Sequence, residues 1–101
     1  MAQLTIDLRT DFEKGVDFDI LEVNVYNVRT FRSRYARVPH RPDGDYIRGQ
    51  RVLRMKGLKQ GPTYGVAVGL LNRNGVPIAS HIEFAPVTKK SNAVSLEIMK
   101  S

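Results

Sequence analysis

Hydrophobic residues recur at every second position along much of the chain, which is the pattern of β-strands with one buried face. The clearest run, residues 64–71, places Val66, Val68 and Leu70 on one face and small residues between them. Further alternating runs lie at residues 4–8, 20–26, 31–38, 46–56, 78–84 and 94–98. Helical periodicity is almost absent. The sequence therefore predicts an all-β domain of about seven short strands.

Turn residues separate these runs. Residues 39–45 combine proline, glycine and aspartate, and Asn74-Gly75 stands between two alternating runs. Asn-Gly favours a tight hairpin, because both residues tolerate left-handed backbone dihedral angles. Pro77, near the start of the following strand, indicates an edge strand or a bulge, since proline cannot donate to a central ladder.

Leu58 and Tyr64 are six positions apart and enclose a loop with one glycine and one proline, and a second glycine, Gly57, directly precedes Leu58. In Greek-key sandwiches a tyrosine at the start of a late strand fills the core edge and turns its hydroxyl back to upstream backbone. With the alternation of residues 64–72, Gly75 and Ser80, this pattern resembles the fibronectin type III family over residues 20–88. The resemblance implies an antiparallel Greek-key β-sandwich whose structural corner is formed by Leu58 and Tyr64.

Two features depart from that family. The tryptophan expected on the second strand is absent, and Val25 occupies its place. Both ends of the chain carry additional alternating segments, so residues 1–15 and 89–101 are available as arms that could add a strand to a neighbour. A related immunoglobulin-like or other antiparallel sandwich therefore remains an alternative.

The length of 101 residues is that of one domain, and we treat residues 1–101 as a single sandwich. The absence of cysteine excludes disulfides and thiol chemistry. The chain begins without a secretion signal and contains no apolar segment long enough to span a membrane. We expect a protein that is made in the cytoplasm and that could be incorporated into a virion.

Residues with catalytic or metal-binding potential are scattered. His40 and His81 are 41 positions apart and do not belong to a metal-ligand spacing. The acidic pairs at residues 17–19 and 43–45 lack the further oxygen ligands of a calcium loop. No nucleophile elbow or phosphate-binding loop is present. We expect no enzymatic activity, no cofactor and no metal.

Charge is divided along the chain. Of the net charge of +6, residues 1–22 carry −4, residues 29–59 carry +8 and residues 60–101 carry +2. If the strands at 31–38 and 46–56 share a sheet, with Phe31 and Tyr35 inward, a basic face forms on its outside. That predicted face consists of Arg32, Arg34, Arg54 and Lys56. Arginine favours planar, bidentate contacts with carboxylates or phosphates.

Three interpretations of the basic segment follow. We expect first a protein partner with an acidic surface, which could be a copy of the chain itself or a capsid or tail protein. A solvated face that keeps the sheet edges unpaired is the second interpretation. Nucleic acid bound through its phosphates is the third, because stacking aromatic residues are scarce. The sequence thus favours a non-enzymatic structural or protein-binding module, such as a capsid-decorating, neck or tail subunit of a bacteriophage virion.

Overall fold

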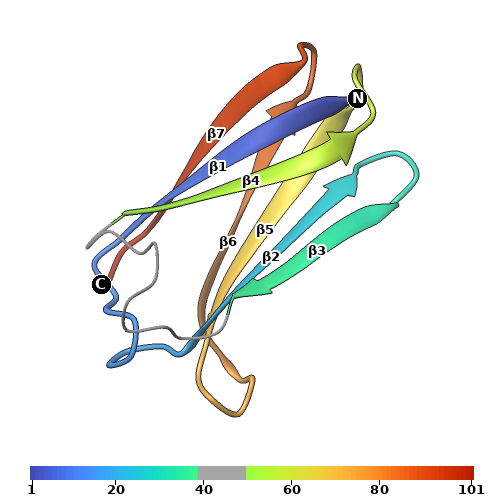
Figure 1. The fold of residues 1–101 in the computed structure, drawn as a ribbon. Helices are drawn as coiled ribbons and strands as arrows, with labels where there is room; N and C mark the ends of the chain where they lie inside the picture. Colours follow the sequence, from blue (N-terminus) through green and yellow to red (C-terminus); the bar gives the residue numbers. More distant parts are fainter. Residues whose placement is uncertain (39–49) are drawn as a thin grey trace.

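A computed structural model describes residues 1–38 and 50–101 of the chain. These residues form an all-β structure of seven strands in two sheets that face each other (Figure 1). The strands are β1 (Ala2–Thr10), β2 (Ile20–Asn27), β3 (Ser33–Val38), β4 (Gln50–Leu58), β5 (Thr63–Leu71), β6 (Pro77–Pro86) and β7 (Ser91–Ile98). The predicted number of strands and the all-β class are confirmed. The predicted turn at 39–45, the strand start at Tyr46 and His40 lie outside the described residues.

One sheet has three strands in the order β4-β1-β7, and the other has four in the order β3-β2-β5-β6. β1 is the central strand of the first sheet. It pairs antiparallel with β4 but parallel with β7, so the prediction of a purely antiparallel sandwich was wrong. β6 ends at the end of the sandwich where β1 begins, and residues 87–90 send β7 back in the direction of β1 (Figure 1).

The two terminal segments that the sequence set apart, residues 1–15 and 89–101, contribute β1 and β7 to the three-stranded sheet. The end of the chain is held against the loop after β1. The ammonium of Lys100 lies 2.8 Å from the Asp17 carboxylate and 5.6 Å from the centre of the Phe12 ring. Hydrogen bonds from Lys100 and from the Glu13 amide lower the pKa of Asp17 below its ordinary value.

The core lies between the two sheets. Alternate residues of β1, β2 and β5 are buried there, as their period of two requires. The largest apolar side chains that are fully buried are Leu4, Ile6, Leu8, Phe18, Val23, Val25, Val66, Val68, Leu70, Val87 and Leu96. Phe18 and Val87 are the members that strand periodicity does not reveal, because they stand in the loops between β1 and β2 and between β6 and β7.

The hairpin between β5 and β6 is organised by Asn72. Its side-chain oxygen accepts hydrogen bonds from the amides of Asn74 and Val76, and Gly75 has a φ of +80°. The loop is thus longer than the two-residue turn that Asn-Gly favours. β6 is an edge strand, and its register with β5 shifts at Pro77. Pro77 therefore marks both an edge strand and a bulge.

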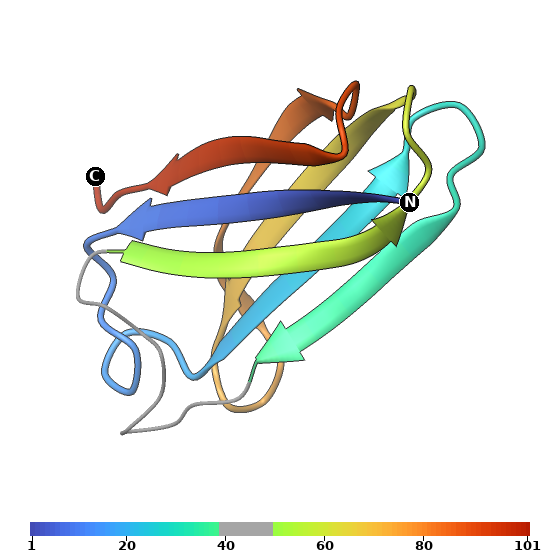
Figure 2. The ribbon, with the colours of Figure 1, turned by 45° about the horizontal axis from the view of Figure 1, so that its top comes forward.

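The placement of the basic strands differs from the prediction. β3 and β4 are edge strands of different sheets, so the described parts of the two predicted strands, 31–38 and 50–56, do not share a sheet. The two edges lie near each other on one side of the sandwich (Figure 2). The predicted faces of β3 were also wrong: Arg34 stands opposite the buried Val25, whereas Tyr35 stands opposite Asn24 and is 55% exposed. The inner face of an edge strand borders solvent, so a long cationic side chain can lie on it. Alternation alone therefore does not determine which face of such a strand points toward the core.

Within the described ranges, 1–38 and 50–101, no helix has the length and apolar character needed to cross a bilayer.

Candidate functional site

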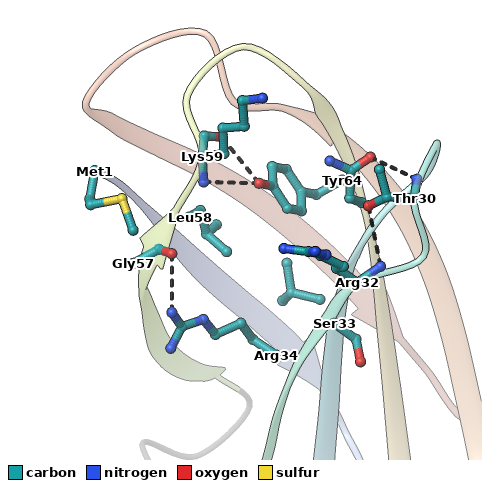
Figure 3. A pocket seen from close by; sticks show the side chains of 11 residues that line it. Met1, Thr30, Arg32, Ser33, Arg34, Gly57, Leu58, Lys59 and Tyr64 are labelled. Carbon is teal, nitrogen blue, oxygen red and sulfur yellow. Dashed lines mark hydrogen bonds between the residues drawn. The ribbon is translucent and has the colours of Figure 1, made fainter.

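A pocket of about 540 Å³ opens between the edges of β3 and β4, at the end of the sandwich where Met1 lies (Figure 3). Its apolar part is formed by Val25, Leu58 and Tyr64, which come from three strands and are all buried. Its polar wall carries Asn27, Thr30, Arg32, Ser33, Arg34 and Lys59. The pocket therefore joins an apolar floor to a basic rim.

Asn27 shapes the connection from β2 to β3. Its side chain is buried, and its oxygen accepts hydrogen bonds from the amides of Arg29, at 2.9 Å, and Thr30, at 3.3 Å. Its backbone amide donates to the carbonyl of Arg32 at 2.9 Å. Asparagine suits this place because a short amide side chain can replace the missing backbone partners of a turn. The turn sets Arg32 on the rim of the pocket.

Phe31 is held in an unusual backbone conformation inside this connection. Its φ is +61°, in the left-handed region that residues with a bulky side chain rarely adopt, and its side chain is 74% exposed. Its amide donates to the carbonyl of Asn27 at 2.8 Å, which helps to fix that conformation. Such a residue costs on the order of 1–3 kcal/mol and is found most often at functional sites.

Arg34 bridges the two sheets across the mouth of the pocket. Its Nη2 donates to the carbonyl of Gly57 at 3.2 Å (Figure 3). Gly57 has a φ of +77°, and a β-carbon built on it would lie 2.7 Å from Nη2 of Arg34. Glycine is therefore needed at this position both for the backbone conformation and for the close approach of the guanidinium group.

Replacing Gly57 with alanine is expected to lower the free energy of unfolding by about 1–2 kcal/mol and to displace the guanidinium group of Arg34. Urea denaturation measures the first effect, and the Nε–Hε NMR signal of Arg34 reports the second. Gly75→Ala is the matched control, because Gly75 has a φ of +80° but nothing within 4 Å of an added β-carbon. An Arg34 signal that moves equally in both variants, or in neither, contradicts the contact.

Leu58 and Tyr64 form the floor at the loop between β4 and β5. The hydroxyl of Tyr64 donates to the carbonyl of Lys59 at 3.1 Å and accepts from the Lys59 amide at 3.0 Å. Leu58 is 3% exposed and Tyr64 is 5% exposed. The ring thus supports the loop between β4 and β5. Lys59 of the same loop also lines the pocket, with a side chain that extends away from Arg32 and Arg34 (Figure 3).

The electrostatic character of the pocket follows from its lining. Among the residues that the structure describes, three cations, Arg32, Arg34 and Lys59, line it and no carboxylate does. The stretches of sequence that include these three cations, residues 28–38 and 50–63, contain no aspartate or glutamate. Like charges that converge on a concave surface raise the local concentration of anions. The site can therefore bind an anionic group whose attached apolar part enters the floor.

The four residues of the predicted basic face separate into two groups. Arg32 and Arg34 line the pocket, whereas Arg54 and Lys56 are exposed on β4, in the other sheet. Both groups lie along the edges on one side of the molecule, with the pocket between β3 and β4. Arg41 and Arg48 of the same segment lie outside the described residues.

Sequence reasoning did not single out Asn27, Gly57 or Lys59 as parts of a site. Lys59 was considered only as a part of the basic segment. Asn27 acts by forming a turn and Gly57 by allowing Arg34 to approach closely, and neither effect is visible in the alternating pattern of the strands. A glycine directly before Leu58 and Lys59 indicates irregular backbone. The need for that glycine becomes clear only in the fold, where Arg34 of the edge strand β3 lies against it.

No family model, curated protein or solved structure matches this chain. In the part of the chain that the structure describes, no group of three or more histidine, cysteine, aspartate or glutamate side chains is arranged to hold a metal ion. His81 is bonded to Glu83 on β6, away from the pocket.

Proposed function

We propose that this chain is a non-enzymatic binding module that docks its basic pocket onto an acidic surface of a protein partner. The observation that carries the proposal is the pocket itself, whose described lining joins Arg32, Arg34 and Lys59 to an apolar floor and includes no carboxylate. Carboxylates of a partner would pair with these cations, and an adjacent apolar side chain of the partner would enter the floor.

The side chains at the rim support a protein partner over a solvated face. Aromatic residues and arginine are the side chains that most often dominate the binding energy of protein interfaces. Phe31 is exposed beside Arg32, and its backbone is held in a strained conformation, so the backbone of this residue needs no further ordering on binding. A face that served only solubility would gain nothing from a strained, exposed phenylalanine.

We also infer that the fold is a Greek-key sandwich of the fibronectin type III or immunoglobulin-like type. The two hydrogen bonds between Tyr64 and Lys59, together with the buried Leu58, support this inference, because they form a tyrosine corner at the start of a late strand. β7 departs from that type, because this C-terminal strand pairs parallel with β1.

Within that class, the proposal places the chain as a small accessory subunit of a larger assembly, such as a capsid-decorating, neck or tail protein of a bacteriophage. The support is a fold-level analogy with the small β-sandwich subunits of such particles, together with the basic docking side. The partner would then be a capsid or tail protein that presents carboxylates, or another copy of this chain.

The double variant Arg32→Glu/Arg34→Glu is expected to weaken binding of a fluorescently labelled polyglutamate peptide by about tenfold or more, because two attractive contacts become repulsive. Fluorescence anisotropy at low ionic strength measures the affinity. Binding by the unchanged protein should also weaken as salt is added, since exposed charge pairs are screened.

Lys89→Glu/Lys90→Glu provides the control. It changes the net charge by the same amount at exposed residues outside the pocket, between β6 and β7. Near-unchanged peptide binding by this variant, beside the loss in the arginine variant, supports the pocket. Equal losses in both variants mean that only overall charge matters, and they count against the proposal.

Nucleic acid is the second candidate, favoured by the charge of +8 over residues 29–59. It predicts binding of DNA or RNA oligomers at low salt, with an affinity that falls steeply as salt rises. Oligomers matched in charge to the polyglutamate peptide separate the two classes. Tighter binding of the oligomer, lost in Arg32→Glu/Arg34→Glu, would replace the protein partner with nucleic acid.

A further inference from the structure

β6 is a long edge strand with one unpaired side. It spans ten residues and pairs with β5 through positions Thr63 to Leu71. The strand order β3-β2-β5-β6 leaves its other side without a partner strand in the described structure. An edge of this length offers a row of backbone donors and acceptors to another strand.

Prolines stand at the two ends of β6, Pro77 and Pro86, but no lysine or arginine protects the edge between them. Ile82 and Phe84 project from its outer face and are 51% and 60% exposed, and Ile78, at the register shift, is 42% exposed. Natural edge strands usually carry lysine or arginine that prevents pairing. β3 has Arg34 and β4 has Arg54 and Lys56 in that role, but β6 contains neither residue type.

The other edge without a lysine or arginine, β7, is different. Its apolar residues Leu96 and Ile98 are buried, and its exposed positions are Ser91, Ala93, Ser95 and Glu97. Covering β7 would therefore remove little apolar surface from water, whereas covering β6 would shield two isoleucines and a phenylalanine.

His81 and Glu83 make β6 self-complementary. They project from the face opposite Ile82, their side chains are 42% and 45% exposed, and Nε2 of His81 lies 2.7 Å from Oε1 of Glu83. If two copies of β6 pair antiparallel about a two-fold axis at Ile82, each His81 stands opposite Glu83 of the other copy. An axis at His81 instead places the two imidazoles together, and one at Glu83 places the two carboxylates together, which is unfavourable.

We propose that β6 is the interface of a homodimer, in which two copies pair antiparallel with Ile82 on the two-fold axis. On the outer face, Ile82 meets Ile82 of the second copy, and each Phe84 lies diagonal to it, within reach of contact. On the other face, two His81–Glu83 pairs join the copies. The two four-stranded sheets then become one continuous sheet, with the β3 edges and their pockets at its two ends.

This arrangement extends beyond the proposed docking function, because it does not use the pocket. It would give the assembly two basic pockets that face away from the dimer axis. A partner with repeated acidic sites would then be bound at two points, which raises the overall affinity without new contacts at either pocket.

The interface is tested first with Ile82→Lys. Sedimentation velocity over a range of protein concentrations is expected to show a dimer for the unchanged chain and a monomer for this variant, because a lysine on the axis faces its own copy. Val76→Lys is the control, since Val76 is 53% exposed but lies outside β6. A monomeric unchanged chain, or a dimer that survives Ile82→Lys, overturns the proposal.

A second pair of variants tests the register and does not depend on Ile82. His81→Glu and Glu83→Lys are each expected to weaken dimerisation by about tenfold, since both cross-copy pairs lose their attraction. An equimolar mixture should form a heterodimer, because each copy then supplies the charge that the other lacks. Circular dichroism verifies that both variants are folded. The absence of a heterodimer in native mass spectrometry of the mixture refutes this register.

Discussion

Replacing Ile6 with alanine is expected to lower the free energy of unfolding by about 3 kcal/mol. Ile6 is 1% exposed on β1, the central strand of the three-stranded sheet, where it stands between Leu53 of β4 and Val94 of β7. The substitution removes three methylene or methyl groups and leaves a space that β1, which is paired on both sides, cannot easily close. Urea denaturation, with an unchanged slope, measures the effect.

Val16→Ala is the control for this prediction. Val16 is 74% exposed in the loop after β1, so its truncation should change stability by less than about 0.5 kcal/mol. If Ile6→Ala costs no more than Val16→Ala, β1 is not a buried strand of this sheet, and residues 1–15 would have to be a detached arm.

Replacing Tyr64 with phenylalanine is expected to cost about 2 kcal/mol. The change removes one hydroxyl and leaves the partly buried amide and carbonyl of Lys59 without the partner they now share. The ring itself stays in the core, so the loss reports the hydrogen bonds and not the packing. Thermal and urea unfolding both measure it.

Tyr35→Phe removes the same atom at a site that is 55% exposed, and its cost should be close to zero. Equal effects of the two substitutions would mean that the corner does not stabilise the loop between β4 and β5. Because that loop also presents Lys59 to the pocket, Tyr64→Phe should weaken polyglutamate binding modestly, and Tyr35→Phe should not.

The sequence predicts the strands well because the buried face of a strand is visible in the alternation of its own residues. Val66, Val68 and Leu70 alternate with small residues, and the structure buries all three. The loop between Leu58 and Tyr64 has the same local character, since its glycine, its proline and the tyrosine that follows are close together in the chain. Pro77 likewise marks an edge strand through a property of proline alone.

The pairing of strands depends on contacts between distant residues, and the alternating pattern does not contain them. It could not reveal that β7 lies parallel to β1, or that β3 and β4 belong to different sheets. For the same reason the faces of β3 were reversed: Arg34 reaches Gly57 across the gap between the sheets, a contact 23 positions apart in the sequence.

The candidate site could be predicted only in part. The concentration of arginine over residues 29–59 indicates an anion-binding side, and Arg32 and Arg34 do line the pocket. The apolar floor combines Val25, Leu58 and Tyr64 from three strands, so it exists only after the two edges approach each other. The strained Phe31 is invisible in the sequence, because a φ of +61° comes from the Asn27 turn around it.

The most direct test of the proposed function is an NMR titration of the ¹⁵N-labelled protein with the polyglutamate peptide. The amide signals of Arg32, Arg34, Gly57 and Lys59 should shift together and saturate, and these shifts should disappear in Arg32→Glu/Arg34→Glu. Signals that remain unchanged around the pocket, or shifts that gather on β6 and β7, would contradict docking through the pocket between β3 and β4.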